Sequence, residues 1–119
     1  MKKIYLYTAD NEKKAFIEKL CIEQQIVFDK LGYADINRTV SEICGMPVKA
    51  GKEHKQPPVM YVLPEVMLFF GMDDKALDDF LDAYNAAGIE KVQRKAVVTP
   101  TNLGWTLYEL TEELGKEIR

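Results

Sequence analysis

The feature that most constrains the fold is a pattern of strand and helix signals that occurs twice along the chain. In each half, a short β-branched and aromatic run precedes a helical pattern, a second apolar run, a loop and a further helix. The halves span residues 4–45 and 66–118, and the connection 46–65 is rich in proline and lysine. We therefore expect a single domain, residues 1–119, that contains two βαβα repeats.

Individual positions of the two halves match with a small drift in spacing. Asp10 corresponds to Asp74 at an offset of 64, and Thr39 corresponds to Thr106 at an offset of 67. Loops between the elements can absorb this drift of three residues. A duplicated βαβα unit predicts this regularity, and convergence on common α/β sequence patterns is the alternative.

The pair Thr39 and Thr106 has a physical role in the predicted helices. Each threonine begins a T-x-x-E pattern, completed by Glu42 in the first half and by Glu109 in the second. In such a capping box the threonine oxygen accepts the N3 amide, and the glutamate accepts the amide of the threonine. We therefore expect the fourth element of each half to begin at its threonine.

Alternation of strands and helices predicts an α/β fold with a four-stranded, mainly parallel sheet flanked by helices. Two repeats side by side give the strand order 2-1-3-4. The continuous apolar run Val66 to Phe70 is typical of a strand buried on both faces. A thioredoxin-like fold or another mixed α/β sandwich is the alternative.

Composition excludes several function classes. The 119 residues carry 16 basic and 19 acidic side chains, a net charge of -3, which lacks the basic footprint of a nucleic-acid binder. No apolar run approaches a membrane span, and the run Ile4 to Tyr7 is too short for a signal peptide.

Cys21 and Cys44 form no C-x-x-C pair, and His54 has no neighbouring zinc ligand. We expect a cytoplasmic protein without nucleic-acid or membrane partners, and a solvated loop at Lys49, Lys52 and Lys55.

The carboxyl ends of strands at the switch point of an open α/β sheet are the favoured place for a ligand. Polar residues gather at these ends in this sequence, and the segment Thr99 to Trp105 is the most distinctive of them. The candidate ligand-binding residues are Thr8, Asp10, Asp73, Lys95, Thr99, Thr101, Asn102 and Trp105.

Two interpretations of these residues are open. Asp10 and Asp73 have the chemistry to share a magnesium ion, but helix capping explains both fully. Asn102 and Gly104 suit a turn that prepares the last helix, with Trp105 as its hydrophobic staple. We predict no catalytic residue, no metal site and no cofactor, because no histidine stands beside a nucleophile and no phosphate-binding loop is present.

The second half contains the run Pro64 to Met72, an aspartate-rich helical segment, and the more specific string K-A-V-V-T-P-T-N at 95–102 followed by Trp105. With these motifs, residues 64–115 resemble a small bacterial family known as a domain of unknown function. The resemblance implies a stand-alone bacterial cytoplasmic protein and supplies no catalytic residues.

Two functional hypotheses follow. The first is a non-catalytic module that binds a small molecule or another protein, with a homodimer through the apolar segment Val59 to Leu63 as one form. The second is an enzyme that acts on a small anionic metabolite at the carboxyl ends of the strands. The absence of a catalytic pattern favours the first.

Overall fold

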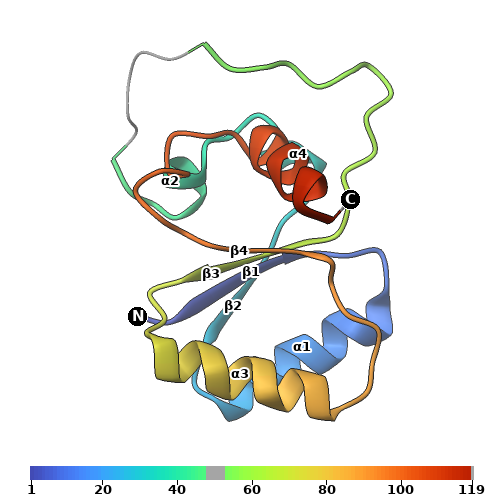
Figure 1. Cartoon of the computed structure of the whole chain (residues 1–119), viewed down its shortest axis with the longest axis vertical. Helices are drawn as coiled ribbons and strands as arrows, with labels where there is room; N and C mark the ends of the chain where they lie inside the picture. Colours follow the sequence, from blue (N-terminus) through green and yellow to red (C-terminus); the bar gives the residue numbers. More distant parts are fainter. Residues whose placement is uncertain (48–52, 119) are drawn as a thin grey trace.

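The chain forms a central sheet between two layers of helices. The computed structural model describes residues 1–47 and 53–118. The first half contains β1 (Lys3–Tyr7), α1 (Asn11–Glu23), β2 (Val27–Lys30), a 3-10 turn (Tyr33–Asp35) and α2 (Val40–Ile43). The second half contains β3 (Val66–Phe70), α3 (Asp74–Ala86), β4 (Arg94–Val97) and α4 (Leu107–Ile118). The expected α/β fold with a four-stranded sheet flanked by helices is confirmed (Figure 1).

The strand order is β2-β1-β3-β4, as expected for two halves side by side. β1 is parallel to β2 and β3 is parallel to β4, so most of the sheet is parallel. β1 and β3 are antiparallel at the centre of the sheet, where Tyr7 pairs with Val66 and Lys3 pairs with Phe70. The two halves therefore run in opposite directions across the sheet.

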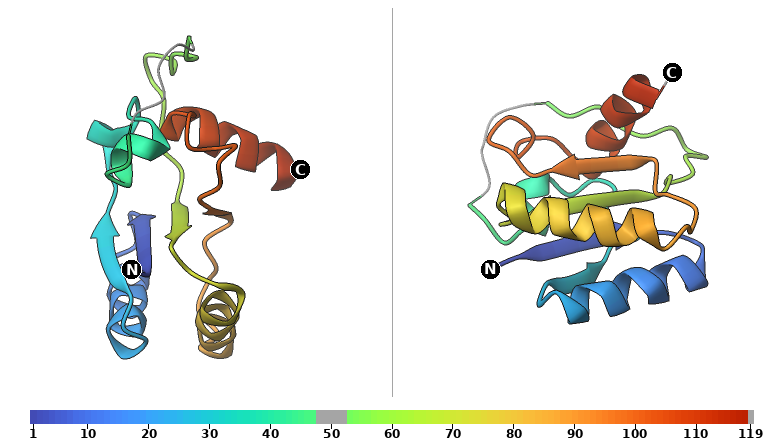
Figure 2. Two further views of the ribbon diagram at one scale, coloured as in Figure 1. Left: turned by 90° about the vertical axis from the view of Figure 1, so that its left-hand side faces the viewer. Right: turned by 60° about the horizontal axis from the view of Figure 1, so that its bottom comes forward.

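Alternation along the central strands divides the apolar side chains between two cores. Ile4, Leu6 and Met67 face α1 and α3 in one core, and Tyr5 and Leu68 face the layer of α2 and α4 in the other. β3 is buried at four of its five positions, as its continuous apolar run predicts. Figure 2 shows α1 and α3 side by side on one face of the sheet.

Both halves pair their two strands in a parallel ladder, but the paired residues are 24 positions apart in the first half and 28 apart in the second. The β1–β2 ladder begins at Lys3 and Val27, and the β3–β4 ladder begins at Val66 and Arg94. α1 and α3 both have 13 residues. The predicted offset of 64 for the first helix is wrong by one residue, because Asp73 and not Asp74 is the N-cap that corresponds to Asp10.

The segments that begin α2 and α4 meet through their backbones. An isolated antiparallel bridge joins Thr39 to Thr106. The amide of Val40 donates to the carbonyl of Trp105 at 2.8 Å, and the amide of Leu107 donates to the carbonyl of Arg38 at 2.9 Å. These reciprocal hydrogen bonds close the α2 and α4 layer over the centre of the sheet.

The two predicted capping boxes form to different extents. The amide of Glu109 donates to Thr106 Oγ1 at 3.2 Å, and the amide of Thr106 donates back to Glu109 Oε1 at 2.9 Å. In the first half, the amide of Glu42 donates to Thr39 Oγ1 at 3.2 Å, and the return is a contact of 3.4 Å from the Thr39 hydroxyl to Glu42 Oε1. Both helices begin at their threonine, but the structure records the full box for the second one.

Candidate functional site

The predicted shared edge for the candidate residues does not exist. Parallel β1 and β3 would place Asp10 and Asp73 together, but the antiparallel pairing puts the end of β1 beside the start of β3. Thr8 and Asp10 therefore lie at one end of the strands, and Asp73 lies at the opposite end. Thr99, Thr101 and Asn102 follow β4, which is parallel to β3, so they lie at the same end of the sheet as Asp73. This expectation is wrong because each half forms its own parallel pair and the two pairs oppose each other.

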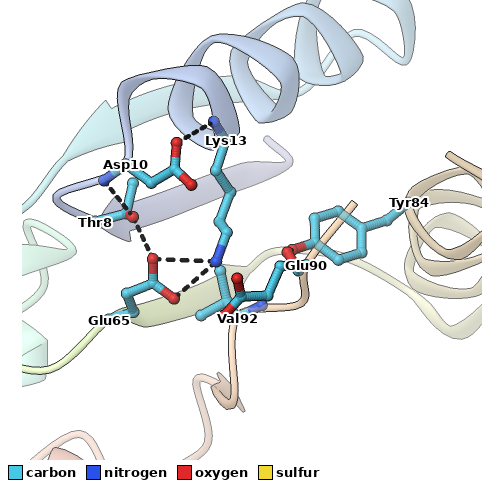
Figure 3. A network of polar contacts seen from close by, with 7 residues as sticks. All are labelled: Thr8, Asp10, Lys13, Glu65, Tyr84, Glu90 and Val92. Atoms are coloured by element: carbon cyan, nitrogen blue, oxygen red, sulfur yellow. Dashed lines mark hydrogen bonds and ion pairs between the residues drawn. The ribbon is translucent and has the colours of Figure 1, made fainter. Parts of the chain in front are cut away.

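The edge at Thr8 and Asp10 contains a polar network that the sequence patterns did not indicate (Figure 3). Lys13 Nζ donates to both carboxylate oxygens of Glu65, at 2.9 and 3.1 Å. The hydroxyl of Thr8 also donates to Glu65, and Thr8 Oγ1 accepts the amide of Asp10 at 3.1 Å. Asp10 caps α1 by accepting the amide of Lys13 at 3.1 Å.

Lys13 is only 5% exposed, which is unusual for a lysine. Burial lowers the pKa of Lys13, but the hydrogen bond and charge of Glu65 outweigh burial, so this pKa lies above its ordinary value. A protonated lysine is neither a general base nor a nucleophile. The only sequence signal for this buried lysine is its position on α1. Lys13 is four residues before the buried Ile17 and therefore lies on the same inner face of the helix.

A hollow of about 230 Å³ lies beside this network and is lined by Asp10, Glu12, Lys13, Ile89 and Glu90. On the same side, the hydroxyl of Tyr84 donates to the carbonyl of Glu90 at 3.0 Å and accepts the amide of Val92 at 3.0 Å (Figure 3). The polar atoms at this edge thus satisfy one another. The Lys13–Glu65 pair is best understood as a structural contact.

The polar groups of the loop after β4 form hydrogen bonds within the loop and with the end of β4. Asn102 Oδ1 accepts the amide of Thr99 at 2.9 Å, and the Asn102 side-chain amide donates to the carbonyl of Val97 at 3.0 Å. Asn102 is buried, whereas Thr101 is exposed. Val97 is in the edge strand β4, so the Asn102 amide occupies a backbone acceptor at the end of that strand. These contacts support the turn interpretation.

The side chains of two further candidates, Asp73 and Lys95, form no hydrogen bond with this loop in the part of the chain that the structure describes. Asp73 caps α3 by accepting the amide of Ala76 at 2.8 Å. Lys95 pairs with Met67 in the sheet and borders a shallow groove beside Leu77 and Leu81 of α3. Asp73 therefore lies away from Thr8 and Asp10, whereas Lys95 is level with Leu6, near the end of β1, but two strands away on β4.

Trp105 lies in a different place, a cleft of about 260 Å³ beside α4. The cleft combines two aromatic rings with charges of both signs. It is lined by Lys55, Trp105, Tyr108, Glu109, Glu112, Glu113 and Lys116. Of the predicted residues, only Trp105 lies in this cleft, because α4 and the connection supply the others.

Glu109 joins the connection to the start of α4. Besides the capping box, Glu109 Oε1 contacts His54 Nδ1 at 2.9 Å, and Glu109 Oε2 accepts the amide of Lys55 at 3.2 Å. Burial raises the pKa of Glu109, but hydrogen bonds from the amides of Thr106 and Lys55 and from His54 outweigh it, so the pKa lies below its ordinary value. Glu109 is consequently a fixed anion in the cleft wall.

Of the other charged side chains in the cleft, two form an ion pair with each other and two, within the described residues, do not. Lys116 Nζ donates to Glu113 Oε1 at 3.1 Å. Glu112 and Lys55 are exposed, and no ion pair involves either side chain in the part of the chain that the structure describes. The cleft therefore offers one carboxylate and one ammonium group next to aromatic rings.

Within residues 1–47 and 53–118, no three His, Cys, Asp or Glu side chains are grouped closely enough to hold a metal ion. Burial raises the pKa of the Cys44 thiol, although contacts with Tyr5 and Lys3 oppose that effect. No helix in the described ranges is both long and apolar enough to cross a bilayer. Lys49 and Lys52 of the predicted basic loop lie outside the described residues.

The described residues form a small mixed α/β fold with a cleft of about 260 Å³ beside α4. In a comparison with protein families, residues 65–119 fit the model of a family described as a domain of unknown function (DUF3783). The matched range begins one residue before β3 and covers the second half, including α4 and most of the cleft. Comparisons with curated proteins and with solved structures found no match.

Proposed function

We propose that the protein is a non-catalytic binding module whose ligand site is the cleft beside α4. The observation that carries this proposal is the juxtaposition of Trp105 and Tyr108 with two charges of opposite sign, Glu112 and Lys55, around one cavity. A ligand-binding pocket typically joins an apolar or aromatic surface to a few polar groups that orient the ligand. At about 260 Å³, this cleft is slightly smaller than typical drug-sized pockets and suits a small molecule.

The charges of the cleft favour a zwitterionic ligand. Glu109 and the Glu113–Lys116 pair are already engaged, so Glu112 would face a cationic group of the ligand and Lys55 an anionic one. The rings of Trp105 and Tyr108 would contact its apolar part. Free amino acids and dipeptides are the simplest molecules with this combination.

Trp105 is the only tryptophan of the chain, so its fluorescence reports on the cleft directly. Titration with a panel of free amino acids and dipeptides should shift its emission. N-acetylated and C-amidated forms of a binding dipeptide should bind more weakly, because each lacks one charge. Glu112→Gln and Lys55→Gln should weaken binding by about five-fold or more, as expected for the loss of one hydrogen-bonded charge. Glu117→Gln, elsewhere on α4, should leave binding unchanged.

Unchanged emission and unchanged melting temperature across the panel would contradict the proposal. Equal binding of the charged and blocked dipeptides would keep the site but contradict its zwitterion preference. The structure makes the enzyme hypothesis less favoured than the sequence did, because the residues on which that hypothesis relied are divided between the two ends of the strands.

We also propose that the two halves arose from a duplicated βαβα unit in a bacterial cytoplasmic protein. The parallel pairing of the two strands within each half, the paired N-caps of Asp10 and Asp73, and the reciprocal bonds around Thr39 and Thr106 support the duplication. A homodimer through Val59, Met60 and Val62 stays a prediction: these side chains are largely exposed, and sedimentation of wild type and Met60→Asp tests it.

A further inference from the structure

A groove of about 440 Å³ lies between α1 and α3, on the face of the sheet opposite α4. Its floor and walls are apolar and are formed by Phe16, Leu20, Ala83, Ala86 and Ala87. Lys19 and Glu23 of α1 stand at its border. Figures 1 and 2 show the two helices side by side, with their outer surfaces uncovered.

The exposed charges of the two helices that form this groove are predominantly acidic. α3 exposes four aspartates, Asp74, Asp78, Asp79 and Asp82, against one lysine, Lys75. Lys75 Nζ donates to Asp79 at 2.8 Å, so the only exposed cation of α3 is already paired. α1 adds three exposed glutamates and two lysines outside the buried Lys13. The solvent-facing charges of the two helices therefore sum to −4.

We propose that the α1–α3 face docks a basic amphipathic helix of a partner protein. An apolar groove between two helices accepts a third helix through side chains spaced at i, i+3, i+4 and i+7. Charge complementarity selects the partner, because lysines or arginines flanking its apolar stripe would meet the carboxylates of α3.

The same charge argues against a second copy of this chain as the occupant. Two α1–α3 faces brought together would juxtapose two surfaces that each carry a charge of −4, and such contacts oppose association. The groove is lined by residues 16–23 of α1, which span roughly 10 Å of helix, or about two turns. It therefore accommodates about two turns of a docked helix.

This inference does not depend on the cleft beside α4, and one experiment separates the two. The probe is a fluorescein-labelled synthetic helix with leucines at i, i+3, i+4 and i+7 and lysines at its other positions. A companion peptide has glutamate in place of each lysine. Fluorescence anisotropy with the full chain should detect binding of the lysine peptide but not of the glutamate peptide, and binding should weaken as salt rises. Trp105 emission should stay unchanged, because Trp105 is on the other side of the sheet.

Two variants test the location. Ala86→Lys places a bulky cation in the groove at an exposed position near the end of α3 and should weaken binding about ten-fold or more, because it adds both a clash and a repulsion. Asp78→Asn with Asp82→Asn should weaken binding by reducing the attraction, while the Lys75–Asp79 pair is kept. Glu117→Gln on α4 changes net charge by the same amount as Ala86→Lys and should have no effect.

Several results would overturn the proposal. They are no binding of the lysine peptide, equal binding of the two peptides, unchanged binding to Ala86→Lys, or a homodimer of the free chain that Ala86→Lys dissociates. Circular dichroism of each variant confirms that its helices are intact.

Discussion

Lys13 of α1 and Glu65, the residue before β3, form a nearly buried ion pair with Nζ–Oε1 at 2.9 Å. Their side chains are 4% and 30% exposed, so the lysine is the more desolvated partner. The pair connects a helix of the first half to the start of the second half. It lies where the end of β1 meets the beginning of β3, a proximity that only antiparallel pairing of these strands allows.

Removing one partner of this pair should destabilise the protein unequally. Glu65→Ala leaves a buried ammonium without its counterion and should cost about 3–5 kcal/mol in the free energy of unfolding. Lys13→Met should cost less, because Glu65 is partly exposed and keeps its hydrogen bond from Thr8. Urea unfolding followed by circular dichroism measures both changes.

The double variant Lys13→Met/Glu65→Leu provides the control. A buried pair replaced by apolar residues of similar volume is often neutral in stability, so the double variant should be more stable than Glu65→Ala. If Glu65→Ala unfolds at the same urea concentration as wild type, the pair is not a structural contact.

Glu109 should contribute to the acid sensitivity of the fold. Burial opposes its ionisation, but the hydrogen bonds from Thr106, Lys55 and His54 prevail and lower its pKa in the folded state. A carboxyl whose folded pKa is depressed stabilises the protein above its unfolded pKa, and this stability is lost as pH falls through the folded value. Glu109→Gln should therefore be less stable than wild type at neutral pH and lose less stability on acidification. Parallel pH profiles of the unfolding free energy would contradict this role.

The two cysteines should differ in reactivity. Burial, with a smaller effect of Glu18, raises the pKa of the fully buried Cys21 thiol to about 12. The Cys44 thiol is half-buried, and its pKa is raised by burial too. At mildly alkaline pH, Ellman's reagent should modify Cys44 slowly and Cys21 only when denaturant unfolds the chain. Mass spectrometry of partly modified protein identifies the site, and early modification of Cys21 would contradict the burial described here.

Asp73 offers a test of capping against ligand binding. Asp73→Ala should cost about 1 kcal/mol, because it removes the acceptor for the amide of Ala76. Asp73→Ser should restore most of this stability, since serine is an equally good N-cap. The matched variants Asp10→Ala and Asp10→Ser should behave in the same way at the start of α1. Full stability of Asp73→Ala would contradict the capping role.

The elements were predictable where one local pattern decides them. Thr106 and Glu109 are three residues apart, so the start of α4 depends on contacts within one helical turn. The apolar run of β3 required burial on both faces, and its neighbours in the fold supply that burial. The strand order also followed, because two matching halves leave few ways to share a sheet.

The candidate site was less predictable because it depends on strand direction. Asp10 and Asp73 have the same relation to their own helices, and nothing local distinguishes a shared edge from opposite edges. The Lys13–Glu65 contact spans 52 residues, and the contact of His54 with Glu109 spans 55. Neither contact produces a periodic pattern of residue types in the sequence, so neither could be predicted from it.

The sequence by itself determined the succession of strands and helices, their caps and the composition of two similar halves, since these depend on neighbours within a few residues. The tertiary structure alone decided that the halves oppose each other across β1 and β3. That decision rests on the packing of both cores at once and on long-range pairs such as Lys13 with Glu65. In the tertiary structure, Trp105 lies in a cleft between α4 and Lys55 of the connection, and the acidic α1–α3 face is open to solvent.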